Sequence, residues 1–150
     1  MKPSHRRHAP AQQAWIVFAG RADHGWQRWL RPGFRHCFAA LHDGEGWLVV
    51  EALTGRLLVS RLAVTPGFDV PDFYRRAEMT VLGPFTVREA TGGGISGRLP
   101  GWLPLNCVNV CRALIGPHAP TAWTPHGLYR GLLRSDVNRK KFLTFASDPG

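Results

Sequence analysis

The sequence has no apolar run long enough to cross a membrane, and no uninterrupted apolar stretch of signal-peptide length. The first 13 residues are basic and polar, and Arg21 and Asp23 cut short the apolar run AWIVFAG that follows them. We therefore predict a protein with no membrane span, synthesised in the cytoplasm without a signal peptide. If it works outside the cytoplasm, something other than a secretion signal must deliver it.

Patterns that bind metals or nucleotides are also missing. The three cysteines, Cys37, Cys107 and Cys111, match no zinc-finger or ribbon spacing, and no HExxH motif occurs. Three cysteines cannot all pair within one chain, which favours a reducing compartment. Residues 92–94 are three glycines, but no Lys-Ser/Thr pair follows them as in a phosphate-binding loop. We predict no metal and no cofactor.

Acidic residues are scarce. The chain has 10 Asp and Glu against 19 Lys and Arg, and its formal net charge is +9. A positive surface attracts polyanions such as nucleic acid, an anionic cell-wall polymer or an acidic protein. Much of the positive charge lies near the two ends of the chain, where it can equally serve to solvate the termini. Binding of a polyanion and solvation of the termini are therefore both open interpretations of this charge. No aromatic-basic RNA-binding motif occurs, so any binding of nucleic acid is expected to be non-specific.

The sequence does contain many short apolar runs separated by turns. Its 17 Gly and 12 Pro fall between these runs, and 44% apolar residues are enough for one core in 150 residues. Period and composition predict strands at residues 14–19, 36–41, 47–53 and 57–64, and one or two more within 79–87. The Asp43-Gly44 pair predicts a hairpin. We expect an α+β fold with a small antiparallel sheet packed against helices.

Helix signals dominate the second half. An apolar helical face predicts a helix within residues 105–115, which Gly116-Pro117 ends, so that Cys107 lies at its N-terminus. A last helix is expected to begin at Thr124-Pro125, with Leu128 and Leu132 one turn apart on the same face. Residues 70–78 fit either a short helix or an irregular segment.

Three segments complete the predicted organisation. Residues 1–13 are expected to form a flexible basic tail, residues 14–134 the folded domain, and residues 135–150 a basic C-terminal tail. The Gly-rich residues 90–104 predict a flexible loop, which would be placed to act as a lid beside Cys107. Trp26 and Trp29 have the spacing of one helical turn that packs on the core.

Cys107 is the candidate nucleophile. The first turn of a helix has unpaired N–H groups and the positive end of the helix dipole, both of which lower the pKa of a thiol. Early-turn amides, including that of Cys107, can also form part of an oxyanion hole. Cys111 lies one turn further along the apolar face, and we expect it to be a core residue.

His36 and Glu51 are the candidate partners of this thiol. His36 opens one strand of the predicted hairpin and Glu51 lies near the end of the other, so antiparallel pairing brings them close. The imidazole can move a proton from Cys107, and the carboxylate can orient the imidazole. Alternation along the strand sends Cys37 to the face opposite His36, which argues against Cys37 as the nucleophile.

Each of these residues also has a purely structural interpretation. A histidine at a strand start is commonly a satisfied structural residue, a buried cysteine is a common core filler, and a glutamate at a strand end can simply reach solvent. It is their joint placement that favours chemistry. The other histidines, including His42 in the hairpin loop, lie in the tail, in loops or in turns and are weaker candidates.

The segments RHCFAALHDGEGWLVVEAL and PLNCVNVCRALIG together resemble the circularly permuted NlpC/P60 group of papain-like proteins, which includes the lecithin-retinol acyltransferase-like branch. In that group a hairpin that begins with His precedes an Asn-Cys helix. The resemblance implies a permuted papain-like architecture and a thiol hydrolase acting on amide or ester bonds. It assigns Cys107 as nucleophile, His36 as base and Glu51 as the orienting residue, where such sites often have a second His or an amide.

Two hypotheses follow for function. The ending AWTPHGLYRGLL is similar to small proteins encoded among tailed-phage structural genes, which implies a cysteine peptidase of the phage tail or virion that cleaves peptidoglycan peptides. The alternative is a non-catalytic structural virion protein of the same fold, whose basic tails bind other virion proteins or nucleic acid.

Overall fold

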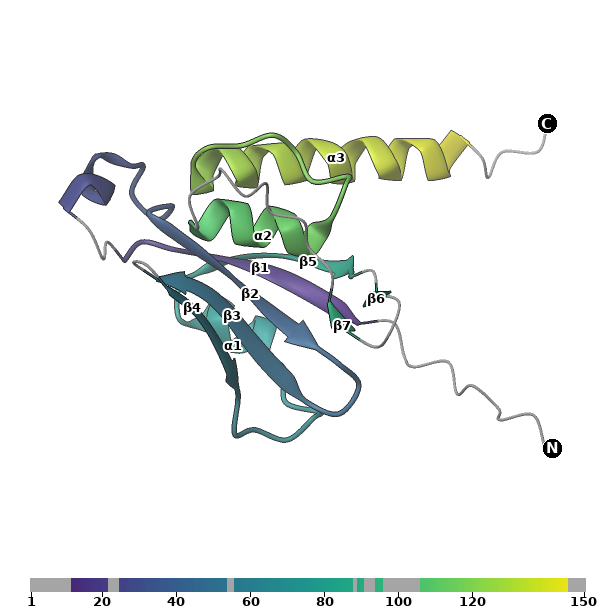
Figure 1. The fold of residues 1–150 in the computed structure, drawn as a ribbon. Coiled ribbons are helices and arrows are strands. Elements are labelled where there is room, and N and C mark those ends of the chain that lie inside the picture. The colour runs from purple at the N-terminus through teal and green to yellow at the C-terminus, as the bar shows by residue number, and fades with distance from the viewer. Residues whose placement is uncertain are drawn as a thin grey trace.

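The computed structural model describes residues 12–21, 25–53, 56–87, 89–90, 94–95 and 106–145. Along the chain these residues form an N-terminal group of strands and a C-terminal pair of helices (Figure 1). The elements are β1 (Gln13–Ala19), the 3-10 helix η1 (Gly25–Trp29), β2 (His36–His42), β3 (Trp47–Leu53), β4 (Arg56–Arg61), α1 (Val70–Arg76), β5 (Thr80–Thr86), β6 (Glu89–Ala90), β7 (Gly94–Ile95), α2 (Cys107–Ile115) and α3 (Pro125–Phe145).

Five strands form one sheet in the order β4-β3-β2-β1-β5, and every neighbouring pair is antiparallel. The predicted α+β class is therefore confirmed at the level of an antiparallel sheet with three α-helices. β2 lies in the middle of the sheet, where it pairs with β1 along its whole length, from Ala19↔His36 to Gln13↔His42. Its pairing with β3 is shorter, from Ala39↔Val50 to His42↔Trp47.

Helices cover both faces of the sheet (Figure 1). α2 and α3 pack on one face, where Phe18, Cys37 and Leu128 belong to the same buried cluster. α1 packs on the other face, where Val70 and Tyr74 contact residues of β1 to β3. Successive residues of a strand point to opposite faces of the sheet. Since both faces are covered by helices, the side chains of β2 are buried on both sides, and its sequence lacks the alternation of a half-exposed strand.

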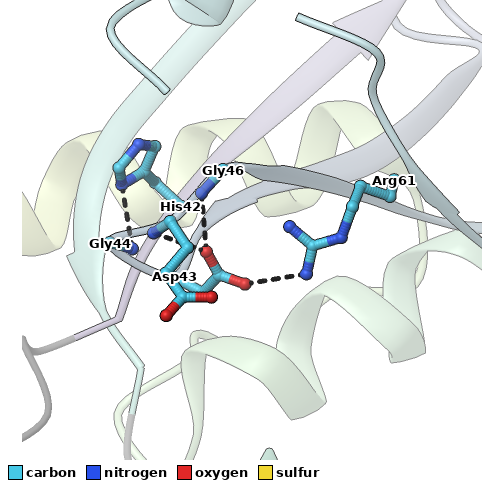
Figure 2. Close-up of polar contacts among 6 residues, drawn as sticks. His42, Asp43, Gly44, Gly46 and Arg61 are labelled. Carbon is cyan, nitrogen blue, oxygen red and sulfur yellow. Dashed lines mark hydrogen bonds and ion pairs between the residues drawn. The ribbon is translucent and has the colours of Figure 1, made fainter. Parts of the chain in front are cut away.

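The turn between β2 and β3 is held by Asp43, as Figure 2 shows. Its carboxylate accepts hydrogen bonds from the backbone N–H of Glu45 at 2.9 Å and of Gly46 at 2.8 Å, and it forms an ion pair with Arg61 at 3.1 Å. Gly44 has a φ of 90°, a conformation that costs glycine little. The predicted hairpin and its turn at Asp43-Gly44 are confirmed.

Several predicted elements differ in detail. β4 ends at Arg61 rather than residue 64, residues 79–87 contain the single strand β5 (Thr80–Thr86), and residues 70–78 contain the short helix α1 (Val70–Arg76). The last helix continues beyond residue 134 to Phe145, because no proline or glycine interrupts residues 132–145. The helix at Cys107 and its stop at Gly116 are confirmed.

The prediction that the tryptophan pair packs on the core is wrong for Trp29. It forms a helical turn as expected, but its side chain is 92% exposed. Helical spacing fixes which residues share a face, but it does not show whether another element covers that face, and none of the described elements covers Trp29. Most of the predicted Gly-rich loop, and residues 1–11 of the predicted tail, lie outside the described residues; within the loop, Gly94–Ile95 pairs with β6. In the described part of the chain, no helix has both the length and the apolar character needed to span a bilayer.

Candidate functional site

Cys107 is the first residue of α2. The helix begins there because Asn106 acts as its N-cap: the Asn106 side chain accepts a hydrogen bond from the N–H of Asn109 at 2.9 Å, and its carbonyl accepts from Val110 at 3.1 Å. The amides of Cys107 and of Val108 come before the first intrahelical donor. The positive end of the helix dipole therefore lies at the thiol, as the sequence predicted.

His36 and Glu51 meet on the face of the sheet that α1 covers. His36 Nε2 donates to Glu51 Oε1 at 2.8 Å. The imidazole is buried, with 6% of its side chain exposed, while Glu51 keeps 26% of its side chain exposed. The carboxylate is therefore the solvent-facing member of the pair. The structure brings these two residues together as the predicted hairpin required, although both lie just beyond the paired residues of β2 and β3.

Tyr74 of α1 lies close to this pair. Burial, and then the negative charge of Glu51, raise the pKa of its phenol, which keeps the hydroxyl protonated at neutral pH. Its ring stacks edge-on against Phe38, the next residue after Cys37 in β2, with ring centroids 5.2 Å apart. Tyr74 thus lies on the α1 side of the site, and no pattern in the sequence indicated this placement.

The third predicted residue, Cys107, reaches His36 from the other layer. The ladder between β2 and β3 includes none of residues 36–38 or 51–53, so the two strands are not paired to each other at this end of the sheet. The first turn of α2 packs here, and the Cys107 side chain hydrogen-bonds to His36. Because Nε2 is engaged by Glu51, Nδ1 is the ring nitrogen left for the thiol.

This environment lowers the pKa of the Cys107 thiol to about 4. The largest cause is a hydrogen bond from the Cys37 thiol, which lowers the pKa. Burial opposes the shift, because it disfavours the charged thiolate. The pKa is lowered further by hydrogen bonds from His36 and from the Cys37 backbone N–H, and by the charge of His36. Burial lowers the pKa of His36, but the hydrogen bonds and negative charges of Cys107 and Glu51 outweigh it, so the net shift is upward. Both shifts favour a thiolate at Cys107 beside an imidazolium at His36.

Cys37 is the site residue that sequence reasoning missed. It is fully buried in β2, and its thiol hydrogen-bonds to Cys107 and to Cys111. The hydrogen bond to Cys107 is the largest of the causes that raise the pKa of Cys37 well above its usual value, so Cys37 remains a neutral donor. Alternation correctly placed Cys37 on the face of the sheet opposite His36, but it did not anticipate this contact.

Cys111 is a buried core residue, as expected. Among the described residues, no group of three or more His, Cys, Asp or Glu side chains is arranged to hold a metal ion. A groove of about 300 Å³ lies elsewhere, between β5 and α3, and is lined by Val81, Leu82, Gly83, Pro84, Phe85, Leu132 and Leu133. The groove is lined by none of Cys107, His36, Cys37 and Glu51.

Comparison with known proteins finds no relative: no family model, curated protein or solved structure matches this chain.

Proposed function

We propose that this protein is a thiol hydrolase that cleaves amide bonds with Cys107 as nucleophile, His36 as proton carrier and Glu51 as the residue that orients the imidazole. The observation that supports this most directly is the arrangement of His36. One ring nitrogen is fixed by Glu51 at 2.8 Å, the other faces a thiol at the start of a helix, and the pKa of that thiol is lowered to about 4. Nucleophile, base and orienting group thus form one chain of contacts.

In the proposed reaction the Cys107 thiolate attacks the carbonyl carbon of the substrate. The negative charge on the carbonyl oxygen is stabilised by the first-turn amides of α2, those of Cys107 and Val108, which have no partner within the helix. The His36 imidazolium then donates its proton to the leaving amine, and a thioester to Cys107 remains. Neutral His36 activates a water molecule, which hydrolyses the thioester and restores the thiolate and imidazolium.

The substrate side of the site is bordered by β4. Leu58 lies directly opposite Glu51 in the ladder, and therefore on the same face, and 42% of its surface is exposed. An exposed leucine beside a partly exposed carboxylate gives this border an apolar floor and one negative charge. A peptide with a small apolar side chain next to the scissile bond suits such a border.

The resemblance to the permuted NlpC/P60 group suggests which amide to test first. The order of His36 in a hairpin before Asn106-Cys107 at a helix start agrees with that group, and the net charge of +9 suits an anionic wall polymer. We therefore propose a permuted papain-like architecture and peptidoglycan peptides as substrate, with a phage tail or other virion as the place of action.

The test is hydrolysis of purified peptidoglycan and of its stem peptides, followed by mass spectrometry of the products. The wild-type chain is expected to release peptide fragments, and Cys107→Ser to release none above background. Cys111→Ser is the matched control, because Cys111 lies one turn along the same helix and is buried, and it should retain activity if the variant folds.

Full biological function of the Cys107→Ser variant would contradict the proposal. Together with strong, salt-sensitive binding of DNA by the isolated chain, it would favour the non-catalytic structural protein instead. Circular dichroism of each variant shows whether a loss of activity reflects a loss of fold.

A further inference from the structure

We infer that Cys37 is a resolving cysteine for Cys107: when a peroxide oxidises Cys107, Cys37 traps the product as a Cys37–Cys107 disulfide, which a thiol reductant reverses. The inference uses the same thiolate as the proposed function, but it does not require that any amide be cleaved. It assigns a modification site and a substrate class, hydrogen peroxide or a small alkyl hydroperoxide.

The geometric basis is the shared cluster of thiols between β2 and α2. Cys37 is fully buried and Cys107 is partly buried against the same core cluster, with a hydrogen bond between their side chains. A thiol placed in hydrogen-bond contact with another sulfur needs only a small movement to form a bond with it. Cys111 contacts Cys37 from one turn further along α2 and is fully buried.

The thiolate at Cys107 makes the first step favourable, because a thiolate and not a thiol attacks peroxide. The Cys107 sulfur attacks one peroxide oxygen, the O–O bond breaks, and the leaving hydroxide takes the proton of the His36 imidazolium to become water. Cys107 is then a sulfenic acid, oxidised by two electrons, and the peroxide has been reduced by two electrons.

The second step joins the two sulfurs. The Cys37 thiol, whose partner is the Cys107 sulfur, attacks the sulfenic sulfur, and its proton leaves with the departing hydroxide. One S–S bond forms, one S–O bond breaks, and a second molecule of water leaves. The charge of the Cys107 thiolate, which opposes ionisation of Cys37, is absent in the sulfenic acid, so oxidation itself frees Cys37 to react.

A resolving thiol protects the site. Without a neighbouring thiol, a sulfenic acid reacts with more peroxide to give the sulfinic acid, which thiol reductants do not reverse. With Cys37 in place, oxidation stops at the disulfide. Cys37 is fully buried, so it can serve in this way without blocking a substrate.

The experiment treats the full chain with graded hydrogen peroxide and maps its peptides by mass spectrometry. The expected product is a peptide pair linked through Cys37 and Cys107, lighter than the two free peptides by two hydrogen atoms and separated by dithiothreitol. In Cys37→Ser, where the serine hydroxyl can still donate to Cys107, the expected product is Cys107 sulfinic acid that dithiothreitol does not reverse. Cys111→Ser is the matched control and should form the disulfide as the wild type does.

The outcomes separate this inference from the proposed function. Rapid iodoacetamide labelling of Cys107 together with peroxide products that contain no Cys37–Cys107 link would overturn the inference and leave the hydrolase proposal standing. A link from Cys111 to either of the other two cysteines as the main product would also overturn it. Because the wild-type map alone decides these outcomes, a variant that fails to fold does not prevent the test.

Discussion

The two ends of β2 each carry a histidine, and the two histidines differ in burial and in hydrogen-bond partners. His36 at the start is buried, donates to the Glu51 carboxylate and faces a thiolate. His42 at the end is only partly buried, donates from Nε2 to the backbone carbonyl of Pro66 at 3.0 Å and accepts from the N–H of Gly44 at 3.2 Å (Figure 2). Both ring nitrogens of His42 are thus used by backbone groups.

The difference lies in the partners. At the hairpin end, Asp43 and His42 bind backbone groups of the turn, so their hydrogen bonds hold a conformation. At the other end β2 and β3 are not paired with each other, and the Cys107 thiol at the start of α2 contacts His36 there. In the proposed mechanism His36 takes part because its second ring nitrogen faces the Cys107 thiol, and this contact lies where the β2–β3 ladder has stopped.

The largest expected effect comes from removing each histidine in turn. We expect His36→Ala to lower the hydrolysis rate by about 10²- to 10⁴-fold, the usual contribution of a general acid and base. His42→Ala should leave the rate within about twofold, because His42 contacts only the turn and Pro66. Equal losses in both variants, measured on stem peptides at neutral pH, would remove the distinction between the two ends.

The next effect concerns the two carboxylates, Glu51 and Asp43. Glu51→Gln keeps an acceptor for Nε2 but removes the negative charge, so the pKa of His36 should fall. The alkaline limit of activity, where the imidazolium loses its proton, should then move to lower pH. Asp43→Asn, at the other end of the strand, should not move the limit of the pH–rate profile, and a shift with Asp43→Asn alone would contradict the account.

A stability effect without a chemical effect is expected for Asp43→Ala. Loss of two hydrogen bonds to the turn amides should reduce the free energy of unfolding by about 1–2 kcal/mol, measured by urea denaturation. Burial opposes the shift, but the hydrogen bonds from Glu45, Arg61 and Gly46 hold the pKa of Asp43 below its usual value. Its stabilisation is therefore present at neutral pH and lost as the pH falls through that lowered pKa, and the alanine variant should lack this acid-side loss.

The smallest expected effect is that of Arg61→Ala. Arg61 pairs with Asp43 at 3.1 Å, but more than half of its side chain is exposed, so the pair contributes about 0–1 kcal/mol. Its urea midpoint should differ little from that of the wild type, and less in high salt. A larger loss than that of Asp43→Ala would show that the ion pair, and not the turn amides, stabilises the hairpin.

The features that could be predicted from the sequence are those with local causes. The turn at Asp43-Gly44 and the start of α2 at Asn106-Cys107 depend on residues within three positions of each other. The contact between His36 and Glu51 followed because antiparallel pairing relates two strands joined by a short turn.

The contact between Cys37 and Cys107 could not be predicted in this way. Alternation tells which face of a sheet a side chain occupies, but not where a helix end will meet the sheet. The exposure of Trp29 was missed for the same reason, since spacing does not reveal whether a face has a neighbour. Both depend on packing between segments far apart in the chain.

The most direct test of the thiolate–imidazolium pair is the pH dependence of iodoacetamide labelling at Cys107, read by mass spectrometry beside Cys37 and Cys111 and repeated in His36→Ala. We predict that wild-type Cys107 labels much faster than the two buried cysteines and that its rate falls only as the pH approaches about 4. In His36→Ala the midpoint should move to higher pH, while Cys37 still supplies its hydrogen bond. Slow labelling of Cys107 with the same pH dependence in both proteins would contradict the pair and, with it, the proposed chemistry.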